Sequence, residues 1–173
     1  MWPFLVLIAV GIKTTSRGPV IFRQRRCGFM QKEFVILKFR TMYQGSGRSG
    51  VDLTSPDDPR ITPVGRFLRK SRLDELPQFW NVLRGDMSVI GPRPYEILSA
   101  QLLLGEEPKA ALRFTVPPGI TGLAQVRGRN GKTLDRMARD TALDLEYINR
   151  RSLRVDIGIL LQTICIMCKG KGI

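Results

Sequence analysis

The sequence has no histidine, so it lacks the side chain that most often acts as a general base in enzymes. Cysteine is scarce as well, because Cys27, Cys165 and Cys168 are too few for a disulfide framework. This scarcity favours a reducing, cytosolic setting. Cys165 and Cys168 have the spacing of half a zinc site, but the second pair of ligands is missing, so the pattern favours an ordinary apolar helix.

No apolar run is long enough to cross a bilayer. A helix over residues 1–12 would measure about 18 Å at 1.5 Å per residue, against roughly 30 Å for the hydrocarbon core. The run also lacks the charged start and the cleavage site of a signal peptide. Trp2 and the following cations Lys13 and Arg17 favour contact with a membrane surface, while a core helix or half of a re-entrant segment stays open. Residues 155–167 are also expected to form an interfacial or core-packed helix.

Acidic residues are few. The 173 residues contain 15 Asp and Glu against 28 Lys and Arg, a net charge of +13 in a chain of single-domain length. This excess predicts an anionic partner, which could be nucleic acid, a phospholipid surface or a phosphorylated small molecule. Two of the rare acids, Asp74 and Glu75, are adjacent within the segment SRLDELPQ (71–78). We therefore take them as the candidate reactive centre.

The chain around this pair predicts a small hairpin followed by helices. Residues 19–23 and 33–40 are rich in β-branched and aromatic side chains, with Gly28 between them, which is typical of a β-hairpin. Alternation should place Lys38 and Arg40 on one face, either as a solvated polar face or as part of a site.

Residues 44–59 are rich in glycine, proline and polar residues, and predict a loop that could act as a lid. A helix should begin near Pro63. Pro77 suits the first turn of a second helix, which Gly85 should end. Asp74 and Glu75 would then lie at or just before a helix N-terminus.

That position favours two ionised carboxylates. Unpaired amides and nearby arginines stabilise anions there, although adjacent like charges raise one of the two pKa values. Asp74 could simply cap the helix, but a cap leaves Glu75 unexplained. Ionised carboxylates suit a nucleophile and a ligand of Mg²⁺, which proteins commonly hold by one or two carboxylates together with substrate phosphates. Neither job needs a general base.

Several segments in consistent order resemble the bacterial sugar transferases, the monotopic polyprenyl-phosphate phosphoglycosyl transferases. The resemblance runs from about residue 2 to about residue 164. The segments are GPVIFRQ (18–24), KFRTM (38–42), LDELPQ (73–78), GPRP (91–94) and PGITGLAQ (118–125).

The resemblance implies transfer of a sugar phosphate from a UDP-sugar to undecaprenyl phosphate, with UMP released, as the first step of exopolysaccharide, capsule, O-antigen or glycoprotein glycan synthesis. Asp74 would be the nucleophile that carries the covalent phosphosugar, and Glu75 would hold Mg²⁺. Four basic residues match the family's motifs and are expected to bind phosphate oxygens. They are Lys38, Arg69, Arg93 and Arg129. Asp144 and Tyr147 belong to another family-like motif that a structural helix contact explains nearly as well.

The implied fold is α+β, a mostly helical single domain with a small β-hairpin or sheet, a partial re-entrant membrane helix and interfacial amphipathic helices. Residues 1–17 would form the membrane-associated helix with its basic flank, and residues 18–173 the catalytic domain. The expected location is the cytoplasmic face of the bacterial inner membrane, against anionic lipids, without nucleic acid as a partner. A homo-oligomer is compatible with the sequence.

Two departures from the family qualify these expectations. The family's re-entrant helix has an arm before its proline break, whereas this chain begins just ahead of Pro3, which predicts weaker anchoring because polar backbone would meet lipid. Leu134 stands where the family often has an aromatic residue. An inactive membrane-surface homologue and a basic nucleic-acid-binding module therefore stay as alternatives, although the chain has none of the usual nucleic-acid-binding signatures.

Overall fold

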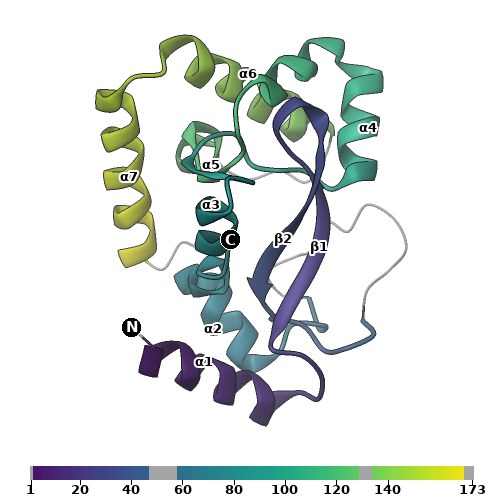
Figure 1. The fold of residues 1–173 in the computed structure, drawn as a ribbon, viewed down its shortest axis with the longest axis vertical. Helices are drawn as coiled ribbons and strands as arrows, with labels where there is room; N and C mark the ends of the chain where they lie inside the picture. The colour runs from purple at the N-terminus through teal and green to yellow at the C-terminus, as the bar shows by residue number, and fades with distance from the viewer. Residues whose placement is uncertain (1, 47–57, 129–133, 170–173) are drawn as a thin grey trace.

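The computed structural model describes residues 2–46, 58–128 and 134–169. It is an α+β fold in which helices predominate and the strands form two small two-stranded sheets. Figure 1 shows α1 at the lower end, α4 and α6 at the upper end, and a long hairpin along one side. The helices are α1 (Trp2–Thr15), α2 (Pro63–Ser71), α3 (Gln78–Leu83), α4 (Ile97–Glu106), α5 (Leu123–Arg127), α6 (Leu134–Arg150) and α7 (Leu153–Cys168).

The predicted hairpin is present, with its first strand shifted along the chain. Strands β1 (Ile21–Cys27) and β2 (Glu33–Phe39) pair antiparallel, with Ile21 opposite Phe39 and Cys27 opposite Glu33. The 3₁₀ turn η1 (Phe29–Gln31) connects them. A second, parallel pair consists of β3 (Ser88–Ile90) and β4 (Gly119–Thr121). Two further 3₁₀ segments complete the fold, η2 (Leu73–Glu75) and η3 (Pro108–Thr115).

Helix α2 begins where its sequence predicts. The side chain of Thr62 caps it by accepting a hydrogen bond from the Gly65 amide at 2.9 Å, and Pro63 occupies the first turn. Gly65 allows the helix to approach the chain leaving β2, because a Cβ there would lie 2.0 Å from the carbonyl oxygen of Thr41. This close contact places α2 beside the end of β2.

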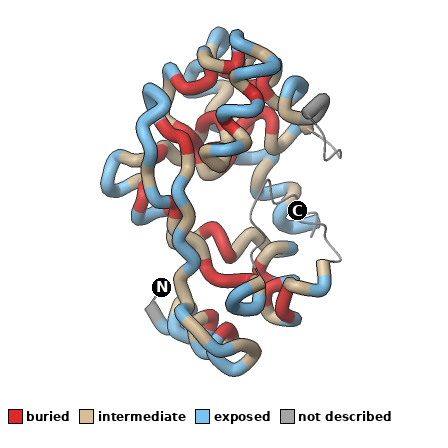
Figure 2. Tube along the Cα trace, turned by 90° about the vertical axis from the view of Figure 1, so that its right-hand side faces the viewer, coloured by how far each residue is buried: buried red, intermediate tan, exposed pale blue. Residues whose placement is uncertain are grey.

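Three clusters of buried side chains form the core, and Figure 2 shows buried segments in both halves of the molecule. The lower cluster joins α1 to α2 and β2 through Ile8, Ile12, Leu68 and Phe39. One side of α1 is therefore packed in the core, while Leu7 and other apolar residues of the same helix are exposed. The other two clusters lie around Phe114 and around Tyr147 with its α5 and α7 neighbours.

Within the described ranges, no helix combines the length and the apolar character that crossing a membrane requires. The re-entrant arrangement of the first helix stays a prediction. Cys165 and Cys168 lie on α7, so the prediction of an apolar helix in this segment is confirmed. Both are exposed free cysteines. Most of the predicted loop at 44–59 lies outside the described residues.

Candidate active site

The acid pair lies in the η2 turn between α2 and α3. Arg72 ends α2 in the left-handed conformation, with φ 55°, and so redirects the chain into the turn. Pro77 then precedes α3, which ends at Leu83 shortly before Gly85, as the sequence predicts. The capping interpretation of Asp74 is wrong, because Pro77 occupies the cap position of α3 and no side chain bonds to the helix there. Both acids are instead held inside the fold, each 8% exposed.

Glu75 is bound by two cations from distant segments. Its Oε1 accepts hydrogen bonds from Lys38 Nζ on β2 and from Arg93 Nη1 after β3, each at 3.1 Å. Burial raises the pKa of this carboxyl, but the charges of Lys38, Arg93 and Arg72 outweigh burial and lower the pKa to about 2. Glu75 is therefore ionised, and it holds Lys38 and Arg93 close to each other.

Asp74 has different surroundings. Among the described residues its carboxylate has neither a hydrogen bond nor an ion pair. Burial raises the pKa of Asp74 to about 6, against the lowering effect of Lys38, and the charge of Glu75 contributes less than burial does. The sequence predicted repulsion between the two acids as the cause, and desolvation is the larger one. At neutral pH the group is still mostly ionised, but it is poorly solvated and available to react.

The predicted basic residues divide into three groups. Lys38 and Arg93 meet at Glu75, and burial lowers the pKa of Lys38 while the Glu75 charge raises that of Arg93. Arg69 donates from Nε to Thr41 Oγ1 at 2.8 Å, and its charge also lowers the pKa of Asp74. Arg129 lies outside the described residues.

The polar face predicted on β2 is not solvated. Lys38 turns to Glu75, and Arg40, just past the strand, is buried and donates to the carbonyl oxygen and the hydroxyl of Ser16 at 2.8 and 2.9 Å. Phe39 packs in the lower core on the other side, as the alternation predicts. The charged residues at this end of the strand therefore serve the site and the α1 connection.

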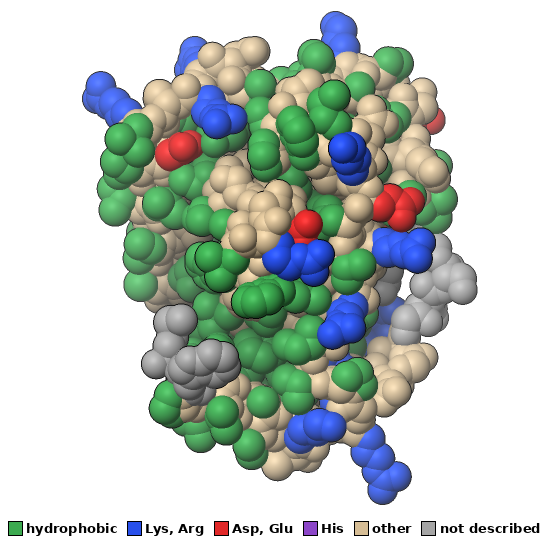
Figure 3. Space-filling model, viewed as in Figure 1, with side chains coloured by type: hydrophobic (Ala, Val, Ile, Leu, Met, Phe, Trp, Pro, Cys, Tyr) green, Lys and Arg blue, Asp and Glu red, His purple; other side chains and the backbone are tan. Residues whose placement is uncertain are grey.

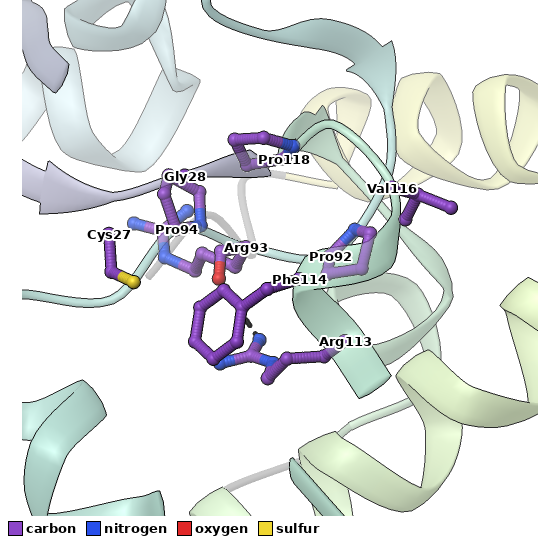
Figure 4. A pocket seen from close by; sticks show the side chains of 9 residues that line it. All are labelled: Cys27, Gly28, Pro92, Arg93, Pro94, Arg113, Phe114, Val116 and Pro118. Atoms are coloured by element: carbon purple, nitrogen blue, oxygen red, sulfur yellow. Dashed lines mark hydrogen bonds between the residues drawn. The ribbon is translucent and has the colours of Figure 1, made fainter. Parts of the chain in front are cut away.

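A buried arginine that the sequence did not reveal supports Arg93. Arg113 Nη2 donates to the carbonyl oxygen of Arg93 at 3.0 Å, the bond drawn in Figure 4, and to Asp144 Oδ2 at 2.6 Å. Its guanidinium also lies 3.7 Å from the centre of the Tyr95 ring. Nothing in the residues around Arg113 marks it, because its partners are distant in sequence. The motif around Asp144 was the only signal for this pair.

The structural interpretation of the α6 motif is the one the contacts support. Asp144 pairs with Arg113, and Tyr147 donates its hydroxyl to Asp156 Oδ1 of α7 at 2.9 Å. Neither side chain reaches Asp74 or Glu75 by any contact of the described residues. Leu134 begins α6.

Asn81, also not identified from the sequence, attaches α3 to β2. It is fully buried, accepts a hydrogen bond from the Leu37 amide at 3.0 Å and donates to the Val35 carbonyl at 2.8 Å. The helix that follows the acid pair is thereby held against the strand that carries Lys38. This contact sets the position of the cation relative to the two carboxylates.

The residues of the site fit a magnesium ion that takes most of its ligands from elsewhere. The described part of the chain contains no group of three or more His, Cys, Asp or Glu residues that could enclose a metal. Glu75 Oε2 and both oxygens of Asp74 accept no hydrogen bond from the described residues. The open oxygen of Glu75 fits the usual arrangement in which one or two carboxylates hold Mg²⁺ together with substrate phosphates.

The chain is also similar in sequence to known proteins. The model of the bacterial sugar transferase family matches residues 1–170. Undecaprenyl-phosphate glucose phosphotransferase of Komagataeibacter xylinus is 46% identical over 168 residues, covering 94% of this chain and 32% of the relative. UDP-glucose:undecaprenyl-phosphate glucose-1-phosphate transferase of Caulobacter vibrioides is 44% identical, covering 94% and 61%. Exopolysaccharide production protein PSS of Rhizobium leguminosarum bv. phaseoli is 44% identical, covering 98% and 88%. The chain thus spans about a third to three fifths of the first two relatives.

Proposed function

Because the chain belongs to the bacterial sugar transferase family, we propose that it transfers a sugar phosphate from a UDP-sugar to undecaprenyl phosphate. The observation that carries the proposal is the contrast within the acid pair. Asp74 is buried, ionisable near neutral pH and unpaired among the described residues, whereas Glu75 beside it is neutralised by Lys38 and Arg93. One carboxylate is thus free to attack, and the other organises positive charge next to it.

The reaction proceeds in two displacements at one phosphorus. A carboxylate oxygen of Asp74 attacks the phosphorus that carries the sugar, and the bond from that phosphorus to the oxygen bridging it to UMP breaks. UMP leaves with the electron pair, and the sugar phosphate stays on Asp74 as an acyl phosphate. An ionised oxygen of the polyprenyl phosphate then attacks the same phosphorus and releases the Asp74 carboxylate. Both nucleophiles are already ionised, so a chain without histidine needs no general base.

Lys38 and Arg93 stabilise the charge that develops on the phosphate oxygens. Both share one oxygen of Glu75, and since an ammonium has three donors and a guanidinium five, each keeps donors for substrate. Arg69 adds a further positive charge near Asp74, and Arg129 is proposed for the same role from its motif. Fixed positive charge of this kind carries much of the catalysis in phosphoryl transfer. Mg²⁺, held by Glu75 and the diphosphate, would neutralise the departing UMP.

An exposed apolar face supports action at a membrane surface. Figure 3 shows apolar side chains gathered over the area where Figure 1 draws α1, α3 and α7. The exposed residues are Leu7 and Val10 of α1, Phe79, Trp80 and Leu83 of α3, and Ile157, Leu161 and Ile164 of α7. We call these residues the apolar face. With exposed Lys13 and Arg17 near the end of α1, it suits the anionic cytoplasmic leaflet of the inner membrane, where the lipid substrate would be reached.

The direct test is detection of the covalent intermediate. The full chain, incubated with UDP-glucose and Mg²⁺, should gain the mass of one sugar phosphate on Asp74 and release one UMP. UDP-glucose is the first donor to use because the names of the Komagataeibacter and Caulobacter relatives specify glucose, and other UDP-sugars follow in a panel. Asp74→Asn should form no adduct. An adduct that forms equally well in Asp74→Asn, or no UMP release with any UDP-sugar, would count against the proposal.

A further inference from the structure

Gln78 is a buried side chain without a structural partner. It begins α3, is 2% exposed, and its Nε2 has no hydrogen-bond partner among the described residues. Asn81, one turn later on the same helix, is equally buried but makes hydrogen bonds to both Leu37 and Val35. Leaving a buried amide unpaired costs about 1–3 kcal/mol, so a group retained in this state calls for an explanation.

The amide lines a small cavity next to the acid pair. The cavity has a volume of about 10 Å³, which is about the space that one water molecule needs. Lys38 and Arg93, which hold Glu75, line the same cavity, and so does Arg26 of β1. Because the charges of Lys38 and Arg93 both lower the pKa of Asp74, the cavity lies within electrostatic reach of the proposed nucleophile.

Arg26 brings a second unpaired donor to this cavity. Its two terminal nitrogens are engaged, Nη1 with the Pro94 carbonyl at 3.2 Å and Nη2 with Gln24 and Glu96. Its Nε, in contrast, is buried and has no partner in the described chain. The two side chains that carry these unpaired N–H donors therefore line the same small cavity as two further cations, Lys38 and Arg93. Donors without acceptors in a positively charged cavity match an anionic oxygen.

We propose that this cavity receives one non-bridging oxygen of the reacting phosphoryl group, and that Gln78 binds it. Gln78 is thus assigned to substrate binding, and Arg26, which lines the same cavity, supports it. The assignment rests on the proposed function for the identity of the substrate, but the demand for an anionic oxygen arises from the donors themselves.

The test uses UDP-glucose in which sulfur replaces one of the two non-bridging oxygens on the phosphorus that carries the sugar. Sulfur is larger than oxygen and a weaker hydrogen-bond acceptor, so the diastereomer that directs sulfur into the cavity should react more slowly. Gln78→Met keeps the volume of the side chain and removes the amide. We expect this variant to lose about tenfold in kcat/KM with unmodified UDP-glucose, the value of one buried hydrogen bond to a charged group, and to reduce the preference between diastereomers severalfold.

A matched control is Gln125→Met on α5, whose Nε2 donates to the Ile120 carbonyl at 3.2 Å away from the cavity. Its diastereomer preference should equal that of the wild type. If Gln78→Met slows both diastereomers equally and leaves the preference unchanged, Gln78 is only structural and the assignment fails. Unchanged kcat/KM in Gln78→Met would also overturn it, because the cavity then holds a resident water only.

A binding measurement separates this inference from the proposed function. Titration of the full chain with inorganic phosphate, followed by calorimetry, needs no turnover. Gln78→Met should weaken phosphate binding about tenfold relative to the wild type and to Gln125→Met. Weaker phosphate binding in a protein that releases no UMP would refute the transferase proposal and keep the anion site. Equal phosphate binding by all three proteins, or none by the wild type, would overturn the site.

Discussion

Asp74 and Glu75 are neighbours in the chain, but their pKa values shift in opposite directions. Glu75 is buried but pairs with Lys38 and Arg93, and its pKa falls to about 2. Asp74 is also buried but gains no partner among the described residues, and its pKa rises to about 6. The difference comes from partners on β2 and after β3. Adjacent acids in a sequence are therefore not equivalent in the fold, and their chemistry follows from which of them is paired.

Formation of the adduct should depend on pH through Asp74. The nucleophile must be ionised, so the rate at limiting UDP-sugar should be constant above about pH 7 and fall below a midpoint near pH 6, approaching tenfold per pH unit. Glu75, with a pKa of about 2, should not titrate in this range. The measurement is the initial rate of adduct formation by mass spectrometry between pH 4.5 and 8. A midpoint near 4 would mean that Asp74 is solvated.

Asp74→Asn should stabilise the protein at neutral pH. Because the folded pKa of about 6 lies above the ordinary 3.8, the native state binds the proton more tightly, and its stability decreases as pH rises from 4 to 6. Above pH 6 the wild type carries the full cost, on the order of 1–3 kcal/mol, since one pKa unit is worth about 1.4 kcal/mol. Urea unfolding should therefore show a gain for Asp74→Asn at pH 7.5 that largely disappears at pH 4.

The exposed carboxylate Glu33 provides the control for that comparison. It faces Arg25 across the hairpin at 3.7 Å, with both side chains more than half exposed. Glu33→Gln should change the free energy of unfolding by no more than about 0.5 kcal/mol at neutral pH. Stability gained equally by both variants would point to a general effect of net charge and would remove the special cost assigned to Asp74.

At the scale of elements, the positions of the site residues depend on hydrogen bonds, close packing and an ion pair between helices and strands. Asn81 joins α3 to β2, and Gly65 lets α2 approach the end of the same strand. The pair of Arg113 on η3 and Asp144 on α6 supports the segment that carries Arg93. Each contact links segments far apart in sequence. None is visible as a local pattern, which is why the hairpin and α2 could be predicted and these attachments could not.

Removal of Arg113 should be far more damaging than removal of a surface arginine. The Arg113 and Asp144 side chains are 1% and 2% exposed, so Arg113→Met would leave an uncompensated buried carboxylate and an unpaired Arg93 carbonyl. We expect a loss of about 3–5 kcal/mol in the free energy of unfolding. The matched control is Arg150→Met, which breaks a pair with Glu146 that is 75% and 33% exposed and should cost at most about 1 kcal/mol.

Lower pH should partly rescue Arg113→Met. Burial raises the pKa of Asp144 to about 6 in the wild type even though the Arg113 charge opposes the rise, so without Arg113 the carboxyl should bind its proton more readily still. The stability difference from wild type should therefore be smaller at pH 5 than at pH 7.5. An equal difference at both pH values would mean that lost packing against Tyr95, and not the buried charge, dominates.

On the scale of the whole molecule, the apolar face is the feature that supports the proposed contact with a membrane. It brings together α1, α3 and α7 from both ends of the chain, although none of the described helices could span a membrane. Its central helix, α3, directly follows the acid pair. Contact with lipid through this face would bring Asp74 close to the phosphate groups of a membrane-embedded acceptor.

Polar substitutions on this face should weaken membrane binding without unfolding the protein. Leu83 and Leu161 are 80% and 63% exposed, so Leu83→Ser and Leu161→Ser should change the free energy of unfolding by less than about 0.5 kcal/mol. The double variant should bind vesicles of phosphatidylglycerol and phosphatidylethanolamine at least tenfold less tightly, because burial of a leucine contributes about 1.5–3 kcal/mol. Leu112→Ser, on η3 outside the apolar face, is the control. Equal vesicle binding by all variants would exclude this face as the contact.

The sequence by itself determined the hairpin, the start of α2 and the helix after Pro77, because strand patterning, capping and proline geometry act over a few residues. It also singled out Asp74 and Glu75 as the candidate pair. The family-like motifs also identified the basic residues that are expected to bind phosphate. Only the tertiary structure decided that Lys38 and Arg93 meet on Glu75, that Arg40 belongs to the α1 connection, and that Gln78 lacks the partners that Asn81 has. Those outcomes depend on burial and on contacts between distant segments. Desolvation and long-range pairing arise only when the chain is folded.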